Sequence, residues 1–164
     1  MQTFLPYPDY YSCAKVLDKK RAWKQVVEAY QILKVLEFRR EGLITKQRGK
    51  KIGWLNHPAV LMWVGYEASL VSYYNIFWDY CVEVHKVKAV KLQKKKDFSG
   101  SKSDPIWLGY EPLHSSHRGR LLDKNPEHYR KFGWIDQPRS EKLGYIWPVD
   151  KNGFLIPEIK VLLK

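Results

Sequence analysis

The chain has 164 residues, of which 45% are hydrophobic, so we expect one compact domain over residues 1–164 with a buried core. Its 29 lysines and arginines exceed its 17 aspartates and glutamates, and the net charge of +12 favours an anionic partner such as nucleic acid. The longest apolar runs are far shorter than the roughly 20 residues of a membrane span, which argues against a membrane partner.

The N-terminal part is predicted to be helical after an extended start. Two prolines keep residues 1–9 extended. Asp9 can cap a short helix through Leu17, and Asp18 can cap a longer helix to about Phe38. In the longer helix, apolar residues recur at helical spacing and predict a buried stripe: Val26, Ala29, Tyr30, Leu33 and Leu36.

A second face of this long helix carries charge. Arg21, Lys24 and Glu28 follow one another at intervals of three and four, which places two cations and a carboxylate together. An ordinary surface salt-bridge ladder has the same spacing and stabilises a helix by about 0.2–0.5 kcal/mol per pair.

Residues 39–53 form a basic connection with three glycines and little periodicity, which predicts a mobile loop. A helical region then begins at Asn56 or His57 and continues to Lys86, with a break at Gly65. Four cations of the loop can close on a phosphate backbone or can simply be solvated: Lys46, Arg48, Lys50 and Lys51.

The second half begins with another basic segment, residues 86–104, which is also expected to be mobile. The segment LHSSHRGRLLDKNPEHY, residues 113–129, predicts a helix that Gly119 weakens, followed by a further helical turn opened by Asn125. The tail mixes apolar and turn residues, which predicts an irregular structure or a small hairpin around Asn152-Gly153.

The polar residues of the 113–129 segment predict a phosphate-binding helix. Its residues line two neighbouring faces at spacings of three and four: His114, His117 and Leu121 on one, and Ser115, Arg118 and Leu122 on the other. The leucines can enter a core and leave hydroxyl, imidazole and guanidinium groups at its edge, where they can bind phosphate oxygens. A solvated amphipathic helix is the alternative interpretation.

Cysteine and histidine spacing gives no sign of a disulfide framework or a zinc site. The first residues, MQTFLPYPD, lack the charged start and the apolar run of a secretory signal. We therefore expect an intracellular protein, cytoplasmic or nucleoid-associated, with no metal and no cofactor. Aromatic residues make up 15% of the chain, and they can stack on extruded bases or fill the core.

Several stretches stand out together: MQTFLPYPD followed by LDKKRAWKQVVEA, then WLNHPAVLMWVGYEASL, then WLGYEPLHSSHRGRLLDKNPEHY with a late YIWPV. With them the chain resembles the pyrimidine-dimer DNA glycosylase family of the phage endonuclease V type, and most closely its uncharacterised cellular branch. The resemblance covers most of residues 1–149. It implies a mainly α, single compact domain whose extended N-terminal segment threads between helices, so that the terminal amine lies beside the DNA.

The resemblance also implies an activity, that of a DNA glycosylase with AP lyase activity acting as a monomer on double-stranded DNA that contains a damaged or modified base. The terminal amine would attack the sugar C1′ of a flipped-out nucleotide, expel the base and form an imine that permits β-elimination. An α-amino group with a pKa near 7.7–8.0 is partly neutral at physiological pH, whereas a surface lysine is mostly protonated.

Two positions depart from the family pattern. Gln2 follows Met1 where the phage enzymes carry a small residue, so the nucleophile is expected to be the Met1 amine, or that of Gln2 if it is exposed. Arg21 matches the family's arginine, but the catalytic glutamate beside it is replaced, and Glu28 is the nearest substitute. His57 can donate a hydrogen bond, act as a base or simply cap its helix.

The resemblance places backbone-binding residues on the last main helix: His114, Ser116, His117, Arg118, Arg120 and Lys124. Lys24 and the cations of the 39–53 loop are further expected DNA contacts. Two other functions remain open. One is a non-catalytic DNA-binding module that keeps the fold, favoured by the replaced glutamate and the retained methionine. The other is an RNA-processing nuclease that uses the histidines as acid and base.

Overall fold

The computed structural model describes residues 2–42, 46–47, 50–51, 53–89, 91–95 and 103–161. Its α-helices are α1 (Tyr10–Val16), α2 (Lys19–Arg40), α3 (Pro58–Leu61), α4 (Glu67–Glu83), α5 (Glu111–Lys124), α6 (Pro126–Tyr129) and α7 (Pro157–Val161). Two 3-10 helices, η1 (Arg130–Phe132) and η2 (Glu141–Leu143), and an antiparallel hairpin of β1 (Lys46–Gln47) and β2 (Lys50–Lys51) complete the elements. The fold is mainly α, as predicted.

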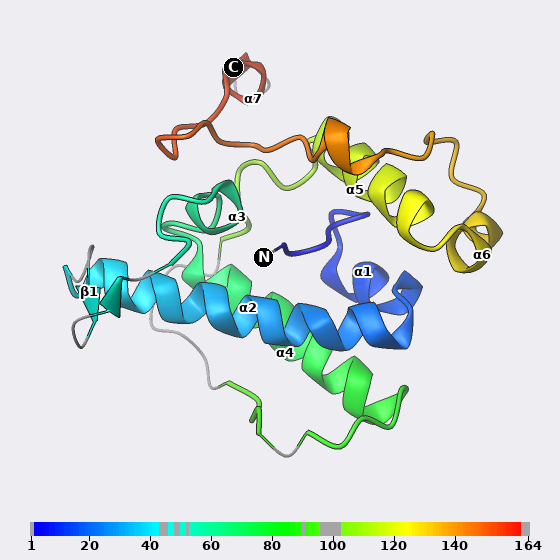
Figure 1. Cartoon of the computed structure of the whole chain (residues 1–164), viewed down its shortest axis with the longest axis horizontal. Helices are drawn as coiled ribbons and strands as arrows, with labels where there is room; N and C mark the ends of the chain where they lie inside the picture. Colours follow the sequence, from blue (N-terminus) through cyan, green and yellow to red (C-terminus); the bar gives the residue numbers. More distant parts are fainter. Residues whose placement is uncertain are drawn as a thin grey trace.

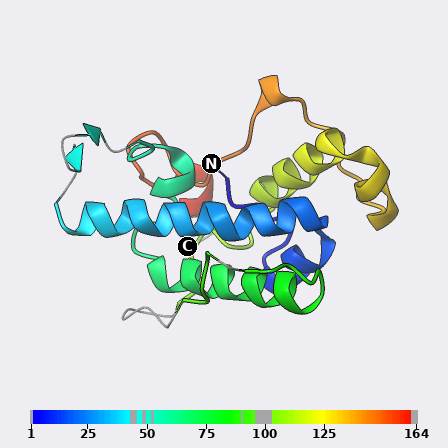
Figure 2. The ribbon, with the colours of Figure 1, turned by 60° about the horizontal axis from the view of Figure 1, so that its bottom comes forward.

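The two longest helices form the base of the molecule. In Figure 1, α2 runs across most of the molecule and α4 packs along it, with α1 against α4. The N-terminal segment, residues 2–9, lies between α2 and α5 and leads into α1. The turned view in Figure 2 shows the same segment between α3 and α5. The N-terminal segment is therefore enclosed by α2, α3 and α5, of which α5 begins about a hundred residues later in the chain.

Local capping signals place α1 and α2 where they were predicted. The Ser12 N–H donates to Asp9 Oδ2 over 2.6 Å at the start of α1, and the Arg21 N–H donates to Asp18 Oδ1 over 3.1 Å at the start of α2. α2 continues to Arg40 rather than to about Phe38. Four residues of its predicted stripe are buried and one is half-buried: Val26, Ala29, Leu33 and Leu36, and Tyr30.

The middle of the chain follows the predicted break. His57 caps α3, because its Nδ1 accepts the Ala59 N–H over 3.1 Å. Gly65, with a φ of +82°, separates α3 from α4 in a left-handed conformation that glycine adopts without strain. Among the described residues, no helix is long and apolar enough to cross a membrane.

The two basic segments are described only in part, and residues 43–45, 48–49, 52, 90 and 96–102 lie outside the described residues. Residues 39–40 belong to α2, and two short strands occupy part of the predicted 39–53 loop. Residues 91–95 are anchored on α4, since the Trp78 indole N–H donates to Leu92 O over 2.7 Å and the Tyr74 hydroxyl donates to Gln93 O over 2.8 Å. This stretch is not a free arm.

The tail contains the predicted hairpin turn. The Asp150 N–H donates to Phe154 O over 2.8 Å, and Gly153 adopts a φ of +87°. A single bridge joins Val149 to Leu155. The short helix α7 that follows was not predicted.

Gly119 has a packing role in α5 that the sequence did not reveal. The Arg139 N–H donates to Gly119 O over 2.9 Å, so the segment after η1 crosses the helix at this position. A Cβ atom at Gly119 would lie 2.7 Å from Gln137 O. Glycine is therefore required for this close approach of two backbones.

We expect Gly119→Ala to lower the free energy of unfolding by about 1–3 kcal/mol, because the new methyl group overpacks this contact. In an unconstrained helix interior the same change stabilises by about 1 kcal/mol. The sign of the change in the free energy of unfolding, measured by urea denaturation, therefore distinguishes the two cases. Increased stability would show that residues 137–139 move aside freely.

Candidate active site

Residues 2–6 run extended between helices, so side chains must satisfy their buried backbone groups. From α2, Gln25 Oε1 accepts the Phe4 N–H over 2.6 Å. From α4, the Tyr73 hydroxyl donates to Phe4 O over 3.0 Å. These bonds fix the N-terminal segment on the two long helices.

Helix α5 holds the same segment from its other side. His117 Nδ1 accepts the Leu5 N–H over 2.8 Å, and His114 Nδ1 lies 2.7 Å from Leu5 O. The guanidinium of Arg118 donates to Pro6 O over 2.9 Å. Three side chains expected to face phosphate therefore bind the chain's own N-terminal backbone.

Gln2 is the first residue that the structure describes, and its backbone N–H is hydrogen-bonded to a carboxylate. The Gln2 N–H donates to Glu28 Oε2, and the two residues are only 6% and 7% exposed. The side-chain amide of Gln2 lies 2.8 Å from His117 Nε2, which fixes the residue from a second direction. Met1 lies outside the described residues. The position of Glu28 two turns into α2 thus brings a buried acid to the start of the chain.

The expected cluster of Arg21, Lys24 and Glu28 is only partly formed. Lys24 Nζ lies 3.4 Å from Glu28 Oε1, and the lysine side chain is 66% exposed. Arg21 turns away, since its guanidinium donates to the capping Asp18 over 2.7 Å and to Lys124 O over 3.1 Å. Arg21 therefore holds α2 to the end of α5 and does not contact Glu28.

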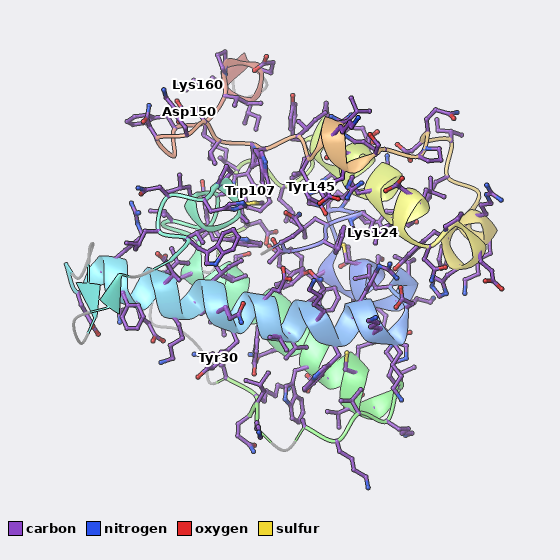
Figure 3. The ribbon with its side chains drawn as sticks, viewed as in Figure 1. Tyr30, Trp107, Lys124, Tyr145, Asp150 and Lys160 are labelled. Carbon is purple, nitrogen blue, oxygen red and sulfur yellow. The ribbon has the colours of Figure 1, made fainter. Side chains whose placement is uncertain are left out.

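A row of rings leads from the N-terminal segment to the surface. The centroids of Tyr145 and Phe4 are 6.0 Å apart, and those of Tyr145 and Trp147 are 5.5 Å apart. The row continues from Trp147 to His57 over 5.6 Å, and from His57 to Trp54 over 5.0 Å. Figure 3 shows Tyr145 beside the N-terminal segment, while Lys124 lies at the far end of α5. We call these five residues the aromatic row.

Two members of the aromatic row respond electrostatically to Glu28. Partial burial lowers the pKa of His57, and the negative charge of Glu28 opposes this shift. Burial raises the pKa of Tyr145, and the charge of Glu28 adds to this shift while Arg120 opposes it. His57 is thus a neutral helix cap near neutral pH, packed between the rings of Trp54 and Trp147.

Five α5 residues expected to contact DNA are buried instead: His114, Ser116, His117, Arg118 and Arg120. Burial lowers the pKa of His117 to about 3 and also lowers that of His114, so both rings are neutral at pH 7. The Ser116 hydroxyl donates to Leu113 O over 2.8 Å. The histidines and this serine serve the interior rather than a phosphate.

The two arginines of α5 are likewise engaged within the protein. Arg118 pairs with Asp136 over 2.5 Å and also with Glu111. Arg120 donates to Asp123 over 2.8 Å and to Arg139 O over 2.7 Å. These contacts correct the expected phosphate-binding face of α5: the helix anchors the N-terminal segment and the tail.

The remaining expected DNA contacts stay predictions. Lys24 and Lys124 are exposed. Lys46, Lys50 and Lys51 belong to the short strands, with only their backbones described. Arg48 lies outside the described residues.

Sequence reasoning missed some of the residues that hold the N-terminal segment. Gln25 is polar but lies within the apolar stripe of α2, and such a residue is a detectable signal for a buried hydrogen bond. Tyr73, and Trp63 whose indole N–H donates to Thr3 Oγ1 over 3.1 Å, sit among other aromatic residues of the core. No local pattern distinguished these two from ordinary packing.

The fold and the site together define a basic, mainly helical protein whose chain start is fixed beside a buried carboxylate. The chain belongs to the pyrimidine dimer DNA glycosylase family, whose model matches residues 1–90. This match includes Gln2, Arg21, Glu28 and His57 and ends before α5. No match was found among curated proteins or solved structures. The family supports a DNA repair function of the glycosylase type in general.

Proposed function

We propose that the protein is a DNA glycosylase with AP lyase activity whose terminal amine attacks a flipped-out, damaged or modified nucleotide in duplex DNA. The observation that carries this proposal is the hydrogen bond from the Gln2 N–H to the buried Glu28 carboxylate. If Met1 is retained, the amine belongs to the residue that precedes this N–H. If Met1 is removed, the Gln2 nitrogen is itself the amine. Either way, Glu28 lies within about one residue of the nucleophile.

The reaction follows from an amine beside a carboxylate. The amine nitrogen bonds to C1′ while the bond from C1′ to the base breaks, and the base leaves with a proton. Glu28 stabilises the cationic sugar and accepts the proton that the amine loses. The sugar ring then opens as the C1′–O4′ bond breaks and O4′ takes a proton, which leaves an imine between the amine nitrogen and C1′. The imine acidifies C2′, whose proton is removed as the 3′ phosphate leaves. Water then hydrolyses the imine and frees the amine.

The surroundings of Glu28 suit a DNA substrate. Lys24 is exposed beside the carboxylate and can contact a phosphate near the attacked sugar. The aromatic row provides ring faces and edges against which an extruded nucleotide can pack.

A non-catalytic DNA-binding module is the second candidate function. Glu28 pairs with Lys24 and accepts a hydrogen bond from Gln2. A carboxylate with a purely structural role makes contacts of the same kind. The RNA-processing alternative loses support from α5, because His114 and His117 are fully buried and neutral and cannot serve as an exposed acid and base.

Borohydride trapping on a duplex with an abasic site tests the proposal. Reduction of an imine joins protein and DNA covalently, so the wild-type protein should form an adduct. Acetylation of the terminal amine should abolish the adduct while DNA binding survives. A protein that binds the duplex without forming an adduct would be the non-catalytic module.

A further inference from the structure

Trp54 has an unusual backbone conformation for a large residue. Its φ is +69°, in the left-handed region that non-glycine residues rarely adopt, and its side chain is 53% exposed. The chain places this conformation on the tryptophan although Gly53 immediately precedes it. Such strain persists only where the surroundings impose it, and it concentrates at functional sites.

Contacts on both sides of Trp54 impose this conformation. The His57 N–H donates to Trp54 O over 3.0 Å and closes the turn. The Arg39 guanidinium, at the end of α2, donates to Leu55 O over 2.8 Å. The indole packs against the His57 ring, with an angle of 72° between the two ring planes. The turn is therefore tied to α2 and α3 while the indole remains half in solvent.

The position of Trp54 differs from that of other exposed aromatic residues. Tyr11 is 56% exposed on α1, where it packs against Tyr80, and Phe154 is 65% exposed in the tail turn. Trp54 instead forms the outer end of the aromatic row, whose inner end reaches the N-terminal segment held by α2 and α5. It also follows the lysines of strand β2 closely in the chain.

We infer that Trp54 stacks on a base of the DNA next to the attacked nucleotide. This inference rests on the proposed function and assigns a substrate contact within it. A flipped nucleotide leaves the faces of its neighbouring bases uncovered, and an indole that is half-exposed on a hydrogen-bonded turn can cover one of them. Stacking of this kind tolerates any base, because every base has a π face.

A duplex with a tetrahydrofuran abasic analogue and an adjacent 2-aminopurine tests this contact, because the analogue cannot form an imine. Binding of the wild-type protein should quench the 2-aminopurine fluorescence as the indole stacks on it. Trp54→Ala should lower the affinity about 5- to 150-fold and abolish the quenching. Tyr11→Ala, a matched loss of an exposed ring, should change neither quantity.

A second variant separates stacking from a structural role. Trp54→Asn should retain or raise the thermal unfolding midpoint, because asparagine adopts the left-handed region more readily, yet it should lose affinity as the alanine variant does. If Trp54 only supports the fold, Trp54→Asn should instead lower the thermal unfolding midpoint and leave the DNA affinity unchanged.

The outcomes also separate this inference from the proposed function. If the wild-type protein forms the borohydride adduct on abasic DNA but Trp54→Ala binds and quenches as the wild type does, only the role of Trp54 is overturned. If the wild-type protein neither binds the analogue duplex nor forms an adduct, the inference and the proposed function fall together.

Discussion

Glu28→Gln is expected to slow imine formation about a hundredfold or more while the fold and the DNA affinity persist. The glutamine oxygen can still accept the Gln2 N–H, so the packing of the N-terminal segment is retained. What is lost is the negative charge that stabilises the cationic sugar and receives the proton. Single-turnover trapping rates on abasic duplex DNA, together with binding and denaturation curves, measure the three quantities separately.

Glu37→Gln is the matched control for this variant. Glu37 lies on the same helix and pairs with Lys34 over 2.8 Å and with Lys95 over 3.6 Å, away from the N-terminal segment. Its loss removes an equal charge from α2 and should leave the trapping rate unchanged. A Glu28→Gln protein that traps at the wild-type rate would reduce Glu28 to a salt-bridge partner and favour the non-catalytic module.

Arg118→Ala is expected to destabilise the protein by about 3–5 kcal/mol, because removing one partner of a buried ion pair leaves the other uncompensated. Asp136 has a side chain that is only 7% exposed. Burial alone would raise the pKa of Asp136, but hydrogen bonds from Arg118 hold it below its usual range. Loss of the arginine also removes the donor to Pro6 O. Urea denaturation measures the effect.

Lys124→Ala separates this structural role from phosphate binding. Lys124 is exposed at the end of α5, so its replacement should leave stability nearly unchanged. If Lys124 contacts a phosphate, the slope of log affinity against log salt should fall by about 0.9. An Arg118→Ala protein with wild-type stability and a reduced salt slope would restore the phosphate-binding interpretation of α5.

The parts of the fold that could be predicted from sequence depend on neighbouring residues. Asp9 and Asp18 cap helices through bonds to N–H groups three residues away, and Gly65 breaks the chain by its own backbone freedom. Each of these signals involves only residues that lie within a few positions of one another in the chain. The prediction of the helices therefore succeeded, although their ends moved by a few residues.

The role of α5 could not be predicted in the same way. Helical periodicity indicates which polar residues share a face, but not whether that face meets water or another segment. The partner of His114 and His117 is Leu5, more than a hundred residues earlier in the chain. Because the threaded segment offers backbone N–H and C=O groups, the face that binds it is as polar as a solvent-exposed face.

The candidate site was partly predictable. The spacing of α2 correctly paired Lys24 with Glu28, and the resemblance directed attention to Gln2. The expectation that Arg21 lies beside Glu28 was wrong, because Asp18, three residues before Arg21, binds its guanidinium as well as capping the helix. This local competition was visible in the sequence. The bond from Gln2 to Glu28 required the fold.

The proposed reaction requires the terminal amine as its nucleophile, and mapping the reduced adduct identifies the nitrogen that attacked the sugar. The wild-type protein would be trapped on abasic duplex DNA with borohydride, digested with trypsin and analysed by tandem mass spectrometry. We predict that the sugar remnant lies on the terminal amine of the peptide that ends at Lys15, on Met1 or, after its removal, on Gln2. A remnant on Lys24, whose amine lies 3.4 Å from Glu28, or on any other lysine would contradict the claim.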